Sequence, residues 1–143
     1  MNREATLVDF EIEHLDSMEC DCDTDYGDFK QRVEDIMKRG ITKTVYYNSK
    51  IIGVMGYFEL WPGVCEVWIA QVKDPDKCGV FAIVIKDGLS RFIDPKKFHR
   101  VQATAADNEV NELFFSRMGF ACEGLLKKYS ITEQDYKMWA RVN

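Results

Sequence analysis

The sequence predicts a single α/β (α+β) domain over residues 1–143, built on a mixed central sheet of about seven strands in the order β-α-βββ-α-β-α-ββ. Three observations predict this class. The chain has 143 residues, of which 46% are hydrophobic and 30% are charged, and this fits one domain able to bury a core. Its apolar residues alternate at strand spacing in some segments and repeat at helical spacing in others. A strand–helix–strand step in the second half indicates a right-handed parallel crossover.

The N-terminal part is expected to hold one strand and one helix. Residues 5–12 (ATLVDFEI) alternate as in a strand. From Phe29 to Met37 the apolar residues recur at helical spacing, and Gly40 is expected to close that helix. The acidic stretch at residues 19–28 is interpreted as a solvated loop rather than a calcium loop, because Gly27 falls one place late and Arg32 stands where the bidentate glutamate should be.

Three antiparallel strands are expected next. Residues 42–61 fit a hairpin that turns at Asn48 and Ser49. The motif WPG then turns the chain into a strand over residues 64–72, which has the composition of a buried strand.

A helix and a strand complete the predicted crossover. The segment VFAIVI alone fits a strand or a helix, but the apolar residues keep helical spacing from Phe81 to Ile93, which favours a helix. A short strand follows at residues 99–105. Ligands of such sheets bind at the carboxyl ends of strands, where the next helix begins. Residues 72–85 are therefore the predicted binding point.

The C-terminal part is expected to hold one helix and two strands. Asp107 or Asn108 would cap the helix, and Gly119 would end it. The strands are predicted at residues 120–129 and 136–142. The apolar stripe of the helix is predicted to consist of Val110, Leu113, Phe114 and Met118.

Charge and cysteine usage exclude several classes of function. The net charge of −5 disfavours a nucleic-acid partner, because phosphate neutralisation needs a basic surface. No apolar run reaches membrane-spanning length and the polar opening does not fit a signal peptide, so we expect no membrane association and a cytoplasmic location. The five cysteines are scattered, so we expect reduced thiols and no metal site.

The element order resembles the GCN5-related N-acetyltransferase (GNAT) superfamily, most strongly in the asparagine-led helix that ends in Met118-Gly119-Phe120 and in the strand–loop–strand that follows. Four blocks of sequence carry a closer resemblance. They are CEVWIAQV (65–72), KFHRVQATA (97–105), RMGFACEGLLKKY (117–129) and YKMWARV (136–142). More particularly, they resemble the small acetyltransferase-like proteins encoded by phages and prophages, some of which travel inside the virion. The resemblance implies one GNAT-like domain that takes acetyl-CoA as its cofactor.

In that family a loop of the pattern Gln/Arg-x-x-Gly-x-Gly/Ala presents backbone N–H groups to the pyrophosphate. Laid onto this chain, the loop is only partly kept, because Val80 stands at the central glycine and Gly79 falls one place early. The alternative interpretation of this segment is a plain helix-starting turn. The resemblance implies that the cofactor-binding residues are Val72, Lys77, Cys78, Gly79, Val80, Phe81, Ala82, Asn108 and Phe115.

Glu66 is the catalytic residue that the resemblance implies. It lies where histone-type members of the family keep a catalytic glutamate, and it shares its strand face with Trp68 and Ala70, which would partly desolvate it. The alternative is an exposed strand glutamate without a catalytic role. Glu59 is the second choice for the base.

Two family positions bear on turnover and on binding. Phe115 stands where the family often has a proton-donating tyrosine, so it could pack beside the thioester but could not donate a proton. Asn108 matches an asparagine that often contacts the cofactor, and an N-cap role would explain it equally well.

The resulting hypothesis is an N-acetyltransferase that moves an acetyl group from acetyl-CoA to an amine, on either a small molecule or a protein. The alternative is a catalytically silent phage protein of the same fold, either a virion component or a protein-binding factor. A sensor of acyl-CoA is a third reading. We also expect that the closing strand could pair with a second copy to form a homodimer.

Overall fold

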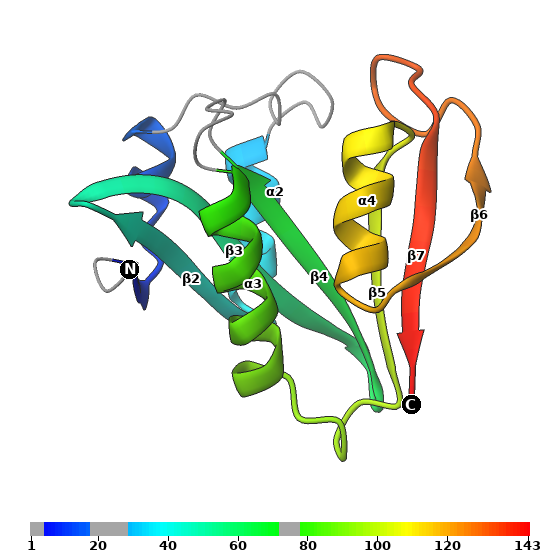
Figure 1. The fold of residues 1–143 in the computed structure, drawn as a ribbon, viewed down its shortest axis with the longest axis horizontal. Coiled ribbons are helices and arrows are strands. Elements are labelled where there is room, and N and C mark those ends of the chain that lie inside the picture. The colour runs from blue at the N-terminus through cyan, green and yellow to red at the C-terminus, as the bar shows by residue number, and fades with distance from the viewer. Residues whose placement is uncertain (1–4, 18–28, 72–77) are drawn as a thin grey trace.

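The structure is a computed structural model of the chain, and it describes residues 5–17, 29–71 and 78–143 (Figure 1). For residues 29–30 and 78–80 it describes the backbone alone. The acidic stretch at 19–28 therefore lies outside the described residues.

The strands form one mixed sheet in the order β1-β2-β3-β4-β5-β7-β6. They are β1 (Thr6–Asp9), β2 (Gly40–Tyr47), β3 (Lys50–Trp61), β4 (Val64–Gln71), β5 (Arg100–Ala106), β6 (Ala121–Leu126) and β7 (Tyr136–Val142). The helical segments are the 3₁₀ helix η1 (Ile12–Ser17) and the α-helices α2 (Phe29–Met37), α3 (Cys78–Phe92) and α4 (Glu109–Arg117). This confirms the predicted fold class and element order, including the parallel step from β4 through α3 to β5.

Local backbone chemistry explains the predicted turns. Asn48 and Ser49 have φ values of 50° and 66°, as a tight turn between antiparallel strands requires. Gly63 has φ 89°, which glycine adopts without a steric penalty, and it turns β3 into β4. Both turns lie where the sequence predicts them.

The helices cover the sheet on both faces. In Figure 1, α3 and α4 lie in front of the sheet and α2 lies behind it. The larger core lies under α3 and α4 and contains Cys65 and Val67 of β4. A smaller core under η1 and α2 contains Val54 and Ala70 and packs against Trp68. Successive residues of β4 therefore face opposite layers.

Some element limits differ from the prediction. The first strand ends at Asp9 rather than at residue 12, because Glu11 donates its backbone N–H to His14 Nδ1 at 3.2 Å and the chain enters η1. The helix α2 ends at Met37, and Gly40 begins β2 instead of closing the helix. The strand β6 ends at Leu126 rather than at residue 129.

The predicted stripe of α4 is wrong in two places. Val110 and Leu113 are 72% and 53% exposed, whereas Phe115 and Met118 are buried. Phe115 lies in the larger core, so the helix turns that side chain toward the sheet.

The prediction that the closing strand pairs with a second copy of the chain is also wrong. The closing strand β7 lies between β5 and β6 and pairs with both, so it has no free edge for a second copy. The edge strand on that side of the sheet is β6.

Close packing fixes the start of α3 over the end of β4. Gly53 of β3 pairs with Gln71, and Phe81 of α3 is fully buried directly above Gly53. A Cβ atom on Gly53 would overlap the Phe81 ring and lie 2.8 Å from the Ala70 carbonyl oxygen. Only a residue without a side chain lets the helix sit this close to the sheet.

We therefore expect Gly53→Ala to lower the free energy of unfolding by about 1–3 kcal/mol, because the ring or the strand must shift. Gly124→Ala is the matched control, since a Cβ there would meet nothing within 4 Å. It should change stability by less than about 0.5 kcal/mol. Urea unfolding followed by circular dichroism measures both, and equal effects would contradict the packing argument.

Candidate functional site

The central strands β4 and β5 pair only at one end. Their parallel register consists of Val64↔Arg100, Cys65↔Val101 and Glu66↔Gln102. Beyond these pairs β4 continues to Gln71 and β5 continues to Ala106, with no further pairing between them in the described residues. Figure 1 shows the two strands together at one end and apart at the other. The backbone N–H and C=O groups that face this split can bind a ligand with amide groups.

The helix α3 begins beside the open end of the split. It follows β4 in the chain and starts at Cys78. The first N–H groups of a helix have no partner within the helix, and the helix dipole favours an anion there. Gly79 and Val80 lie in this first turn. The first turn of α3 could therefore receive phosphate groups, next to strand backbone that could receive an extended amide chain.

Two buried donors near the split have no hydrogen-bond partner among the described residues. They are Gln71 Nε2, at the end of β4, and Trp139 Nε1, on β7 opposite Ala103. Ala103 is the first residue of β5 beyond the last pair with β4. Buried donors are normally satisfied, so these two are candidates to bind a polar ligand. The sequence alone gives no indication of either.

Glu66 lies at the apex of the split, in the last pair before the strands part. It is half-buried, and its Oε1 accepts a hydrogen bond from Gln102 Nε2 at 3.0 Å. It shares the face of β4 that carries Trp68 and Ala70, on the α2 side of the sheet. The predicted partial burial of Glu66 is confirmed, and its role as a base stays a prediction.

Gln102 connects Glu66 to an ion pair. Arg100 donates from Nε to Gln102 Oε1 at 2.8 Å. Its two terminal nitrogens donate to the carboxylate of Glu123 on β6, at 2.6 and 3.1 Å. These contacts raise the pKa of the Arg100 guanidinium and lower the pKa of the Glu123 carboxyl. The four side chains form one connected polar chain.

The predicted loop residues are only partly described. Val72 and Lys77 lie outside the described residues. Of Cys78, Gly79 and Val80 the structure describes only the helical backbone. The Phe81 side chain is fully buried, and Ala82 packs against the same core. Their side chains therefore have a packing role, and a cofactor contact is left to their backbone.

The two predicted positions on and before α4 have structural roles. Asn108 caps the helix, and its Oδ1 accepts the N–H of Asn111 at 2.8 Å. Phe115 is 6% exposed and stacks on Trp139, with ring centroids 5.6 Å apart and an interplanar angle of 15°. The N-cap role of Asn108 is confirmed, and contact of either residue with a cofactor stays a prediction.

Glu59, the second choice for the base, is not brought to the split. It pairs with Cys65 in the register of β3 and β4, which places it on the α3 side of the sheet. Its carboxylate lies 3.7 Å from Lys97 Nζ. Glu66 is therefore the better placed of the two.

The sequence interpretation missed Arg100, Gln102 and Glu123. The alternation of Arg100 and Gln102 on a predicted strand indicates a shared face. Their register with Glu66, and the position of β6 next to β7, come only from the fold.

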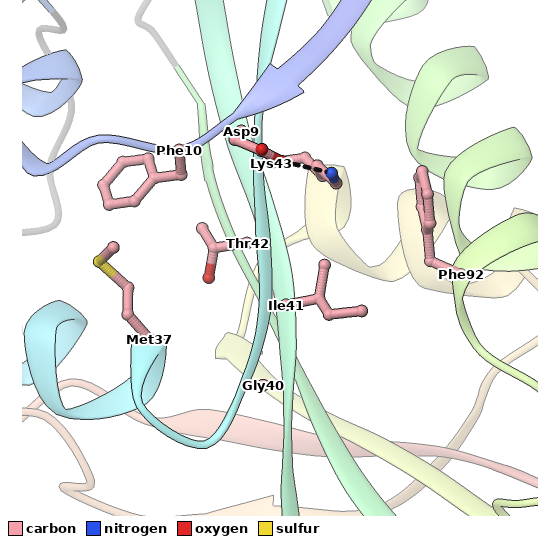
Figure 2. Close-up of a pocket in the computed structure, with 8 residues that line it drawn as sticks. All are labelled: Asp9, Phe10, Met37, Gly40, Ile41, Thr42, Lys43 and Phe92. Atoms are coloured by element: carbon pink, nitrogen blue, oxygen red, sulfur yellow. Dashed lines mark hydrogen bonds and ion pairs between the residues drawn. The ribbon is translucent and has the colours of Figure 1, made fainter.

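A separate hollow of about 390 Å³ lies at the other edge of the sheet. Figure 2 shows Phe10 and Met37 on one side of β2 and Phe92 on the other, while Lys43 reaches toward Asp9. Lys43 Nζ lies 2.6 Å from the Asp9 carboxylate. This hollow is not part of the split between β4 and β5.

Comparison with solved structures gives the class of fold. The ribosomal α-N-protein acetyltransferase RimL, solved with coenzyme A, superposes with a TM-score of 0.77 at 12% identity, over 98% of this chain and 94% of that one. An IAA acetyltransferase from Bacillus cereus gives 0.75 at 14% identity, over 97% and 99%. A GNAT family acetyltransferase from Elizabethkingia anophelis, with acetyl-CoA bound, gives 0.73 at 12% identity, over 99% of both chains.

The chain therefore has the fold of the GCN5-related N-acetyltransferases. No protein-family model and no curated protein matches it by sequence. None of the three structures named above is described as a phage protein, so the closer resemblance to phage-encoded proteins gains no support from them. Within the described residues, no helix is long and apolar enough to cross a membrane.

The ion pair between Arg100 and Glu123 predicts a pH dependence. The pKa of Glu123 is lowered from 4.5 because Arg100 stabilises the carboxylate. Its contribution to stability is therefore complete above about pH 4.5 and is lost as the pH falls through the lowered pKa. In ¹³C NMR titrations, the Glu123 carboxyl should titrate below 4.5 in the native protein and close to 4.5 in Arg100→Met. Identical midpoints in the two proteins would contradict the pairing.

Proposed function

We propose that this protein is an N-acetyltransferase that transfers the acetyl group of acetyl-CoA to an amine. The observation that carries the proposal is the split between β4 and β5, with Glu66 at its apex and α3 beginning at its open end. Fold likeness at 12–18% identity would not be enough without this arrangement.

The residues present fit acetyl-CoA. The unpaired backbone of β4 and β5 suits the amides of a pantetheine arm, and Gln71 Nε2 adds a buried donor without a partner in the described chain. The first turn of α3, with Gly79 and Val80, would hold the pyrophosphate through backbone N–H groups. The predicted contacts of Val72 and Lys77 belong to the same proposal. When bound, the cofactor supplies an activated acetyl group as a thioester.

The acceptor amine would approach from the α2 side of the sheet. The helices α3 and α4 cover the opposite face, and the described part of η1 and α2 packs on β3 and β4. Glu66 and Gln102 lie on the α2 side, at the point where β5 parts from β4. An amine entering there meets the Glu66 carboxylate before it reaches the split.

Glu66 would act as the general base. The amine nitrogen would form a bond to the acetyl carbon, and the bond from that carbon to sulfur would break. The amine proton would pass to Glu66, either directly or through one water. The departing thiolate takes its electron pair with it. Phe115 cannot protonate it, but a thiolate is a good leaving group because thiols have an ordinary pKa near 8.5.

The charge of the protein favours a cationic acceptor. The net charge is −5, and Glu66 adds a negative group at the proposed entrance. Alkyl-ammonium compounds, lysine side chains and protein N-termini all belong to this class.

One observation favours a second candidate, a silent protein that keeps the fold. Phe115 is locked against Trp139 in the core, and the position lacks the hydroxyl that the resemblance would lead one to expect. Such a protein could serve as a phage virion component or as a binder of other proteins. Binding of acetyl-CoA without any turnover would favour a sensor, and a lack of binding would favour this silent scaffold.

We expect acetyl-CoA to bind with micromolar affinity in isothermal titration calorimetry. Gly79→Asp places a negative charge in the first turn of α3 and should weaken binding by about tenfold or more. Ser90→Asp is the matched control, because Ser90 is exposed and lies near the other end of the same helix. It should leave the affinity unchanged. No binding by the folded wild-type protein would refute the proposed function.

We expect Glu66→Gln to lower kcat by about 100-fold and to leave KM for acetyl-CoA unchanged, because the cofactor does not depend on the base. Mass spectrometry of the acetylated product, with a panel of lysine peptides, N-terminal peptides and polyamines, gives the rates. Glu59→Gln removes a charge from the same hairpin on the opposite face and should keep kcat within about twofold of the wild type. An unchanged kcat in Glu66→Gln would remove Glu66 from the mechanism.

A further inference from the structure

Hydrogen bonds connect Glu66 on β4 through Gln102 and Arg100 on β5 to Glu123 on β6. We propose that Gln102 is a positioning residue, which Arg100 and Glu123 hold in one orientation so that it holds the Glu66 carboxylate for the acceptor amine. This inference rests on the proposed function, because it gives the role of a residue that acts through the proposed base.

The chemistry of Arg100 fixes the orientation of the Gln102 amide. A guanidinium group has only donors, so its Nε can meet only the oxygen of the amide. That contact is 2.8 Å long. The amide NH₂ group must then point the other way, toward Glu66 Oε1 at 3.0 Å. A flipped amide would lose both hydrogen bonds at once.

Glu123 holds Arg100 from the far side of β7. The guanidinium lies on β5 and the carboxylate on β6, and β7 pairs with both strands. Two parallel hydrogen bonds of 2.6 and 3.1 Å leave the guanidinium little freedom to turn. The Arg100 side chain is 26% exposed, so water competes only in part for these contacts.

The neutral Gln102 amide separates the Arg100 guanidinium from the Glu66 carboxylate, and this separation suits a carboxylate that has to accept a proton. A guanidinium bound directly to Glu66 would stabilise its carboxylate strongly and make it a poorer proton acceptor. Gln102 transmits the orientation of Arg100 without placing a cation on Glu66, and Glu123 balances the charge of Arg100. Among the described residues Gln102 is the side-chain partner of Glu66, and it engages one oxygen only. The second oxygen remains for the amine proton.

Enzyme kinetics test the positioning role. Gln102→Met keeps the length of the side chain and removes both hydrogen bonds, so we expect kcat to fall by about tenfold with KM for acetyl-CoA unchanged. In the double variant with Glu66→Gln, the second change should cost nothing more, because Gln102 acts only through Glu66. Gln31→Met, the same substitution on the exposed face of α2, should keep wild-type kinetics.

The contact itself is tested by NMR, without turnover. In the wild-type protein the Gln102 side-chain N–H that faces Glu66 should resonate downfield of the other glutamine side chains, and it should move upfield in both Glu66→Ala and Arg100→Met. Signals that are unchanged in the folded variants would overturn the proposal.

The outcomes separate the two claims. An active wild-type enzyme whose kcat survives Gln102→Met, or losses that multiply in the double variant, would overturn the positioning role and leave the proposed function standing. A wild-type protein that acetylates no amine in the panel would refute the proposed function, and the positioning role would fall with it.

Discussion

The early end of the pairing between β4 and β5 is the constraint on which the rest of the site depends. Each strand is fully paired on its other side, β4 with β3 and β5 with β7. The sheet therefore consists of two complete halves that meet at three residue pairs. Because strands twist, halves joined only at one end separate along their length. Backbone groups left unpaired in this way are costly unless water or a ligand binds them, so the split is a candidate binding site.

The two faces of the sheet carry different parts of the candidate site. On one face, the fit of Phe81 over Gly53 sets the position of α3 and with it the first turn that would receive phosphate. On the other face, the alternation of β4 brings Glu66 out beside Gln102. Glu66 stands in the last pair before the split, so its side chain lies next to both the gap and the open face. In the proposed function, one strand would therefore serve both the cofactor and the base.

The sequence predicted what depends on local patterns. Strand alternation, helical spacing and the turn residues Asn48 and Ser49 are local, and the fold class and element order follow from them. The stripe of α4 failed because Leu113 and Phe115 are both apolar, and only tertiary packing decides which of them faces the core. Glu66 could be selected by family resemblance, but Gln102 could not. Its role depends on a parallel register between strands that are far apart in the chain, and sequence spacing does not encode that register.

The stacking of Phe115 on Trp139 bears on how the reaction could proceed without a proton donor at that position. Trp139 Nε1 is a buried donor without a partner among the described residues, and the phenylalanine stacked on it offers no oxygen that could accept its hydrogen bond. Phenylalanine also has no hydroxyl with which to protonate a thiolate. In the proposed reaction the thiolate would therefore leave unprotonated. That is tolerable for a thiol and would not be for an amine or an alcohol. The polar groups of this site are gathered around Glu66, which in the proposed reaction would take the proton that an acceptor ammonium must lose before it can attack.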